Sequence, residues 1–124
     1  MSEDRAPCKD DAGTVTAETA VVLPVLVVLT VAFAWLVLLG VTHMRAVDAA
    51  RETARLVARG ESVAAASARG AAVAAPGSSI QVSVGAVEVS VSVTSPLRPP
   101  GRLLNVALGQ EIEAHAVAAR EPLS

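Results

Sequence analysis

Aromatic residues are nearly absent from this sequence of 124 residues, which contains one Trp, one Phe and no Tyr. Nucleic-acid sites need aromatic stacking platforms or a basic stripe, and the formal net charge here is −2, so we expect no nucleic-acid binding. Cysteine is equally scarce. Cys8 is the only one, which excludes a disulfide within the chain.

Groupings that could support catalysis or metal binding are also missing from the sequence. His43 and His115 stand alone, without Cys or carboxylate partners at metal-ligand spacing. No serine lies in a nucleophile-elbow context, and no glycine-rich loop joins a strand to a helix. We therefore expect a protein that is not an enzyme, with no metal, no cofactor and no small-molecule substrate.

Alanine and valine are abundant instead, with 25 and 21 copies, and the apolar residues gather in one long run. Thr19 to Thr42 covers 24 residues without a charge. A helix of that length reaches about 36 Å, which is enough to cross a hydrocarbon core of ~30 Å. The pattern predicts a transmembrane helix over residues 14–42. Pro24 lies inside it and removes one backbone donor, so we expect a mild bend there.

The segments on either side of this run differ sharply from it. Residues 1–13 include six charged residues and cannot bury a core, which favours disorder or removal of this segment. Residues 43–75 predict an amphipathic helix that continues the membrane helix, with Gly60, Gly70 and Pro76-Gly77 as successive places where it could end. The predicted apolar face of this helix consists of Val47, Ala50, Ala54, Val57, Ala64 and Ala68.

Residues 76–124 predict a small β-rich region. Apolar and polar residues alternate over 80–84 and, after Gly85-Ala86, over 87–93, which indicates two strands and a tight turn, or a single strand with a bulge at Gly85. Residues 110–120 alternate again and are interpreted as a third strand, with a short helix as the alternative. We expect a loop over 95–102 and leave 103–108 unassigned.

Together these segments predict an α+β fold. A long amino-terminal helix, with a transmembrane front half and an amphipathic rear half, precedes a small antiparallel sheet of about three strands. The valine-rich face of the sheet needs a cover, and the alanine face of the helix is the remaining apolar surface that can supply one.

One acidic residue stands at the start of the apolar run. Glu18 lies five residues after Gly13, and two explanations compete. In the first, Glu18 occupies the first helical turn, where an acid complements the helix dipole by ~0.3–1 kcal/mol. In the second, Gly13 ends a leader, and Glu18 neutralises a new amine on Thr14 of the same or a neighbouring chain. A charge at the bilayer centre costs at least ~2.5–3.5 kcal/mol, which makes such a partner physically worthwhile.

Two motifs in this region resemble a known family. Residues 13–26, Gly13-Thr-Val-Thr-Ala-Glu18-Thr-Ala-Val-Val-Leu-Pro24-Val-Leu, are similar to the start of TadE-like proteins, the minor pilins of the Tad (Flp) tight-adherence type IV pilus. Residues 47–55, Val-Asp-Ala-Ala-Arg-Glu-Thr-Ala-Arg, resemble the post-membrane helix of actinobacterial members. Thr19 follows the glutamate where major Flp pilins usually carry an aromatic residue, which favours a minor pilin over the main fibre subunit.

The resemblance implies a processing and assembly role. It implies cleavage between Gly13 and Thr14 by a membrane-embedded aspartic prepilin peptidase, and a docking role for Glu18. It further implies a single-pass protein of the cell membrane with its carboxyl side outside the cytoplasm, acting in pilus assembly or adhesion. The expected partners are the peptidase, other pilin subunits, the Tad secretion machinery and the membrane.

Two other interpretations remain open. The chain could be an unprocessed single-span membrane protein with a small exterior binding domain, or a secreted protein whose apolar run is a cleaved signal peptide. Arginines 45, 51, 55 and 59 follow the apolar run, and by the positive-inside rule they favour the opposite orientation to the one that the resemblance implies. The mature amino terminus separates the three interpretations: Thr14, Met1 or Ser2, or a residue near Ala50.

Overall fold

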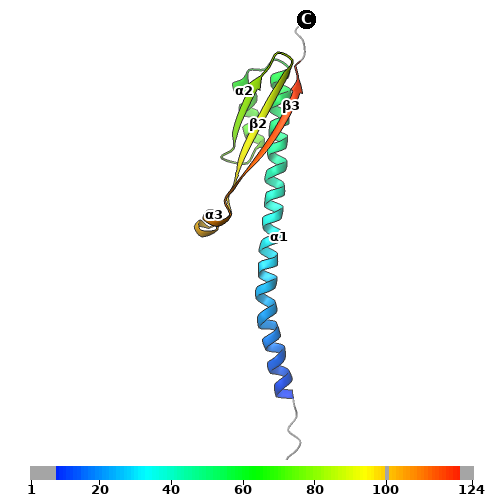
Figure 1. Cartoon of the computed structure of the whole chain (residues 1–124), viewed down its shortest axis with the longest axis vertical. Coiled ribbons are helices and arrows are strands. Elements are labelled where there is room, and N and C mark those ends of the chain that lie inside the picture. Colours follow the sequence, from blue (N-terminus) through cyan, green and yellow to red (C-terminus); the bar gives the residue numbers. More distant parts are fainter. Residues whose placement is uncertain (1–7, 100, 121–124) are drawn as a thin grey trace, which may run out of the picture. The chain divides into compact units, whose positions relative to one another are not determined.

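A computed structural model describes residues 8–99 and 101–120 of the chain. The described residues form three helices and one three-stranded sheet (Figure 1), which confirms the predicted α+β fold class. The elements in chain order are α1 (Cys8–Ala58), α2 (Val63–Val73), β1 (Ser79–Val84), β2 (Glu88–Leu97), α3 (Arg102–Leu108) and β3 (Gln110–Ala119). The chain divides into two structural units between Leu36 and Val37, and α1 contributes residues to both.

Helix α1 ends at Ala58, so the prediction of one helix continuing to about residue 75 is wrong. The helix stops at the first of its three predicted stops, because Gly60 adopts a positive φ of 98°. The Gly60 N–H donates to the Val57 carbonyl at 3.0 Å and the Glu61 N–H donates to the Leu56 carbonyl at 3.1 Å. These are the two hydrogen bonds of a Schellman motif, which a glycine at this position makes inexpensive.

A separate helix, α2, follows this turn and has its own apolar face. Ser62 is its N-cap, and the Ser62 hydroxyl accepts a hydrogen bond from the Ala65 N–H at 3.2 Å. The turn resets the helical phase, so Ala64 and Ala68 of the predicted apolar face are exposed. Ala66 and Gly70 are buried in their place.

The three strands form one antiparallel sheet in the order β1-β2-β3. A tight turn joins β1 to β2, with Val84 paired to Val89 and the Gly85 N–H donating to the Glu88 carbonyl at 2.8 Å. The hairpin is therefore confirmed, and a single strand with a bulge at Gly85 is wrong. The third strand over 110–120 is also confirmed as β3, so its alternative of a short helix is wrong.

Strand β2 is longer than the sequence predicts, since it runs through residues 95–97, where we expected a loop. Pro96 made that segment look irregular, but it pairs with Glu111 of β3. The pairing of β2 with β1 already ends at Thr94. Pro96 has no backbone N–H, but at this position no β1 carbonyl needs one. Residues 103–108, which the sequence left unassigned, belong to α3.

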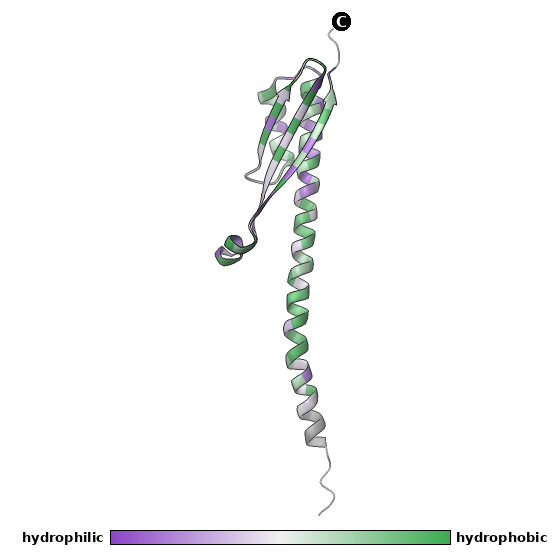
Figure 2. Cartoon of the chain, viewed as in Figure 1, coloured by the Kyte–Doolittle hydropathy of each residue, from purple (hydrophilic) through white to green (hydrophobic). Residues whose placement is uncertain are grey.

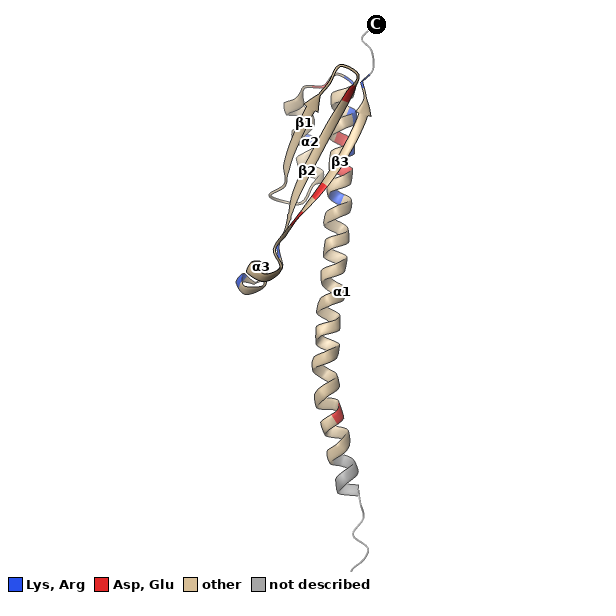
Figure 3. Cartoon of the chain, viewed as in Figure 1, with Lys and Arg blue, Asp and Glu red and all other residues tan. Residues whose placement is uncertain are grey.

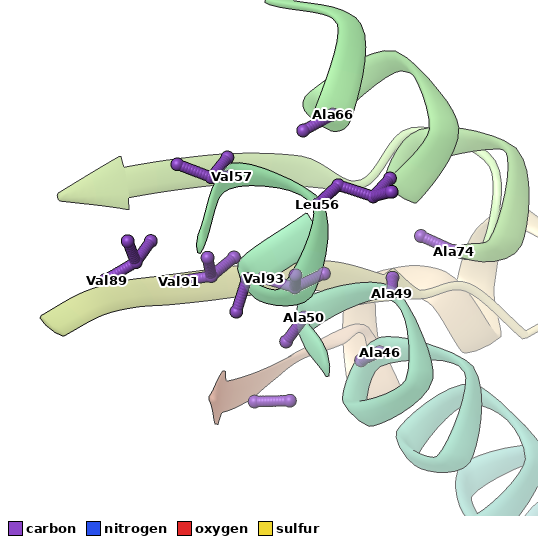
Figure 4. Packing of buried hydrophobic residues seen from close by; sticks show 12 residues of the cluster. Ala46, Ala49, Ala50, Leu56, Val57, Ala66, Ala74, Val89, Val91 and Val93 are labelled. Atoms are coloured by element: carbon purple, nitrogen blue, oxygen red, sulfur yellow. The ribbon is translucent and has the colours of Figure 1, made fainter. Parts of the chain in front are cut away.

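The core of the second unit packs alanines of α1 against valines of β2 (Figure 4). This confirms the expectation that the alanine face of the helix covers the valine face of the sheet. Small side chains let the helix backbone lie close to the sheet, and β-branched valines fill the pleated surface opposite. The buried cluster consists of Ala46, Ala49, Ala50, Ala54, Leu56, Val57, Ala66, Ala74, Val89, Val91, Val93 and Ala114.

Helix α2 approaches α1 closely at a glycine. A Cβ built on Gly70 would lie 2.1 Å from Thr53 Oγ1 and 3.0 Å from Ile80 Cδ1. Thr53 is fully buried, and its hydroxyl is already engaged because it donates to the Ala49 carbonyl at 2.8 Å. A side chain at residue 70 would therefore force the two helices apart.

We predict that Gly70→Ala destabilises the second unit. Overpacking costs about 1–3 kcal/mol, which exceeds the ~1 kcal/mol that alanine contributes to a helix interior. Thermal unfolding of the detergent-solubilised chain, followed by circular dichroism, measures the change.

Two control variants isolate the steric cause. Gly40→Ala, at a helical glycine with nothing within 4 Å of an added Cβ, should be neutral or stabilising. The double variant Thr53→Ala/Gly70→Ala removes the nearest clashing atom and should recover part of the loss. A Gly70→Ala chain as stable as the unaltered protein would contradict the close approach.

Candidate functional site at the amino-terminal end of helix α1

The front part of α1 presents an apolar surface on every side. One helix in the described part of the chain, over Gly13–Ala58, is long and apolar enough to cross a membrane, and none of its most apolar window is buried. Most large apolar side chains of this stretch are exposed, among them Val21 at 68%, Val28 at 67% and Val41 at 44%. Figure 2 shows this stretch as a nearly unbroken hydrophobic segment. A helix that is apolar all round needs a membrane or partner helices to cover it.

Glu18 is the only charged residue between Asp11 and Arg45. The Glu18 side chain is exposed, and among the side chains of residues 13–99 and 101–120 no described ion pair includes its carboxylate. Figure 3 shows charge gathering in the later turns of α1 and on the strands, while the front of α1 carries very little. The structure thus presents one carboxylate on an otherwise apolar helix surface.

Gly13 and Thr14 lie within the same helix, one turn before Glu18. Gly13 is exposed, does not have a positive φ, and an added Cβ would meet nothing within 4 Å. Glycine weakens a helix interior by ~1 kcal/mol relative to alanine, so the fold itself gives no reason for glycine here. The three β-branched residues that follow, Thr14, Val15 and Thr16, also favour helix weakly.

Pro24 lies in the interior of α1, and the helix continues through it. Its ring removes the hydrogen bond that residue 24 would otherwise donate to the Ala20 carbonyl. Two neighbouring threonines bond to their own helix, since the Thr19 hydroxyl donates to the Val15 carbonyl at 2.9 Å and the Thr30 hydroxyl donates to the Leu26 carbonyl at 2.8 Å. The bend at Pro24 stays a prediction.

The charged and polar groups of the second unit form surface pairs. On α1, Arg55 pairs with Glu52, which lies three residues earlier. His115 Nε2 lies 3.3 Å from Glu113 Oε1 on the exposed face of β3. Over residues 13–99 and 101–120, no three His, Cys, Asp or Glu side chains gather as a metal site would require.

Sequence reasoning left one exposed feature without a function. Helix α3 buries none of its residues, although it carries three leucines and a valine. The signal that could have found it is the stretch from Val89 to Gln110, which contains two arginines and no acidic residue.

Comparison with known proteins agrees with the resemblance carried by the two motifs. Residues 13–55 match the family described as TadE-like protein. The matched segment begins at Gly13, includes Glu18 and Pro24, and ends at Arg55 near the end of α1. No curated protein and no solved structure matches the chain.

Proposed function

We propose that the chain is a membrane-inserted minor pilin of a Tad (Flp) type IV pilus, because its residues 13–55 match the TadE-like family. The family is a structural component of the pilus, which agrees with the expectation that the chain is not an enzyme. The observation that supports the proposal most directly is the single carboxylate at Glu18, one turn after a glycine that the fold does not require.

The first step of the proposed function is removal of residues 1–13 by a prepilin peptidase. A peptidase must draw the scissile bond out of its helix, and local opening is easiest where helix propensity is lowest. Gly13 and the β-branched residues after it make the Gly13–Thr14 bond such a place. The absence of a Cβ at Gly13 also allows close approach of another protein to the backbone.

The second step is docking of the mature helix through Glu18. Cleavage would leave a positively charged amine on Thr14, and four residues of helix place the Glu18 carboxylate about 6 Å along the same face. The carboxylate can neutralise this amine, or the amine of a neighbouring subunit, as the helices pack side by side. In an apolar environment an unpaired charge is expensive, so the pair would set the position of each subunit relative to the next.

The remaining parts of the chain follow from this arrangement. Residues 14–42 would span the cytoplasmic membrane, with Pro24 bending the helix to fit its neighbours. The sheet and α2 would face the outside of the cell, where a unit without cysteine needs no disulfide. Partners would then be the peptidase, other pilin subunits and the Tad secretion machinery.

Amino-terminal sequencing of the membrane-associated protein, taken from cells with their native secretion genes, tests the proposed function. We expect the mature chain to begin at Thr14. A chain that begins at Met1 or Ser2 would make the protein an unprocessed single-span anchor, and Glu18 a helix-end acid. A start near Ala50 would identify the apolar run as a cleaved signal peptide and remove the pilin assignment.

A further inference from the structure

We propose that helix α3 binds the membrane surface, with its apolar side chains in the headgroup region and Arg98 and Arg102 on anionic lipid headgroups. This inference rests on the proposed function, because it requires that residues 14–42 span a bilayer. It adds a second membrane contact to the exterior unit, separate from the transmembrane helix.

The apolar side chains of α3 have no cover in the chain. Leu103 is 88% exposed and Val106 is 90% exposed, and Leu104 and Leu108 are each more than two-fifths exposed. Figure 1 shows α3 beyond the sheet, at the end where β2 finishes and β3 begins. Four large apolar side chains on a seven-residue helix form a patch that water does not stabilise, so a covering surface is needed.

This end of the sheet lies beside the turn of α1 that leaves the apolar run. A hollow of about 450 Å³ is lined by Val41, Thr42 and Arg45 of α1 together with Leu97 and Arg98 at the end of β2. Thr42 is the last residue of the charge-free run and Arg45 is the first charge after it. If the run spans the bilayer, this shared hollow would place Leu97 and Arg98 near the level of the headgroups.

A second hollow connects α3 to the same point. It measures about 270 Å³ and is lined by Leu97 and Arg98 from the end of β2, by Asn105 and Gly109 from α3 and the residue after it, and by Glu111 of β3. Helix α3 therefore lies next to residues that themselves lie next to the membrane exit of α1. All these residues belong to the unit that begins at Val37.

Charge selects an anionic lipid surface as the occupant. The stretch from Val89 to Gln110 contains Arg98 and Arg102 and no acidic residue, and Glu111, which follows it, lines the hollow together with Arg98. Arginine guanidinium groups beside apolar side chains suit a surface that has phosphates above and acyl chains below. The bilayer matches the patch, the charge and the location together.

Lipid-quencher fluorescence on the full chain tests the inference. The chain carries Cys8→Ser and a single new cysteine labelled with an environment-sensitive dye, and it is reconstituted in phosphatidylcholine vesicles containing phosphatidylglycerol. A spin label attached near the headgroup end of the acyl chain quenches dyes at that depth. We expect the dye on Val106→Cys to be quenched several-fold more than the same dye on Val87→Cys. Val87 is the matched control, since it is 76% exposed in the β1–β2 turn at the other end of the sheet.

Trp35 separates failure of this inference from failure of the proposed function. It is the only tryptophan in the chain and lies in the apolar run, so brominated lipids should quench its fluorescence in unlabelled protein. If Trp35 is quenched but the Val106 dye resembles the Val87 dye, the anchor stands and the α3 inference is overturned. An unquenched Trp35 overturns the membrane span and the α3 inference together.

Two further variants, Arg98→Gln and Arg102→Gln, test whether these arginines contact anionic headgroups. Each should weaken the membrane contact of α3 about fivefold in vesicles with phosphatidylglycerol, and neither should change it in pure phosphatidylcholine. Unchanged quenching in both vesicles would overturn the assignment of these arginines to lipid headgroups.

Discussion

A Gly13→Leu variant should accumulate as the full-length precursor. A leucine side chain holds the Gly13–Thr14 bond away from the peptidase, and a displacement of about 1 Å can slow a positioned reaction by about a hundredfold. Leucine also strengthens the local helix by ~1 kcal/mol, which makes opening of the bond more difficult. Intact-mass measurement of the membrane-associated protein distinguishes the precursor from a chain that begins at Thr14.

Gly40→Leu is the matched control for this variant. Gly40 is a second glycine of α1 with nothing within 4 Å of an added Cβ, so the same substitution there should leave processing unchanged. Normal cleavage of Gly13→Leu would contradict the peptidase assignment. Loss of cleavage in both variants would show that the substitution acts through general damage to the helix and not through the cleavage position.

A Glu18→Ala variant should be processed and inserted into the membrane, yet fail to join pilus complexes. Insertion is retained because removing a carboxylate lowers the cost of placing this turn in the bilayer. Loss of one partner from a buried charge pair costs about 2 kcal/mol or more, which corresponds to about thirtyfold in affinity. Co-purification with the other pilin subunits from solubilised membranes measures the effect.

Thr19→Ala is the control for Glu18→Ala. The Thr19 hydroxyl donates to the Val15 carbonyl of its own helix, so its removal leaves no partner subunit with an unpaired group. We expect Thr19→Ala to co-purify normally. Unchanged co-purification of Glu18→Ala would remove the docking role and leave the residue as an acid that complements the amino-terminal end of the helix dipole.

Gly13→Leu and Glu18→Ala each change a feature that is local in sequence, and local features can be predicted from sequence. The charge-free run, the position of Pro24 inside it and the single carboxylate at Glu18 require no knowledge of distant residues. The three strands were also predictable, because alternation with period two reflects one covered face of a sheet. Roles for Gly13, Thr14 and Glu18 in processing and docking remain predictions for the experiments above.

The two errors have different causes. Pro96 is typical of a loop in sequence, but β3 pairs with it from a distance along the chain, and this pairing cannot be derived from local spacing. Alanines 64 and 68 fit the helical period of α1, yet the local turn at Gly60 resets the helical phase and exposes both. Gly60 was one of three possible stops, and spacing alone does not select among them.

The apolar helix, the isolated acid on it and the alternating strands follow from local periodicity and charge along the chain. The close approach of α2 to Thr53 at Gly70, and the uncovered position of α3 near Arg98, follow from the folded arrangement alone. The physical reason is that close packing and exposure depend on what surrounds a residue in space, and a residue type does not record its neighbours.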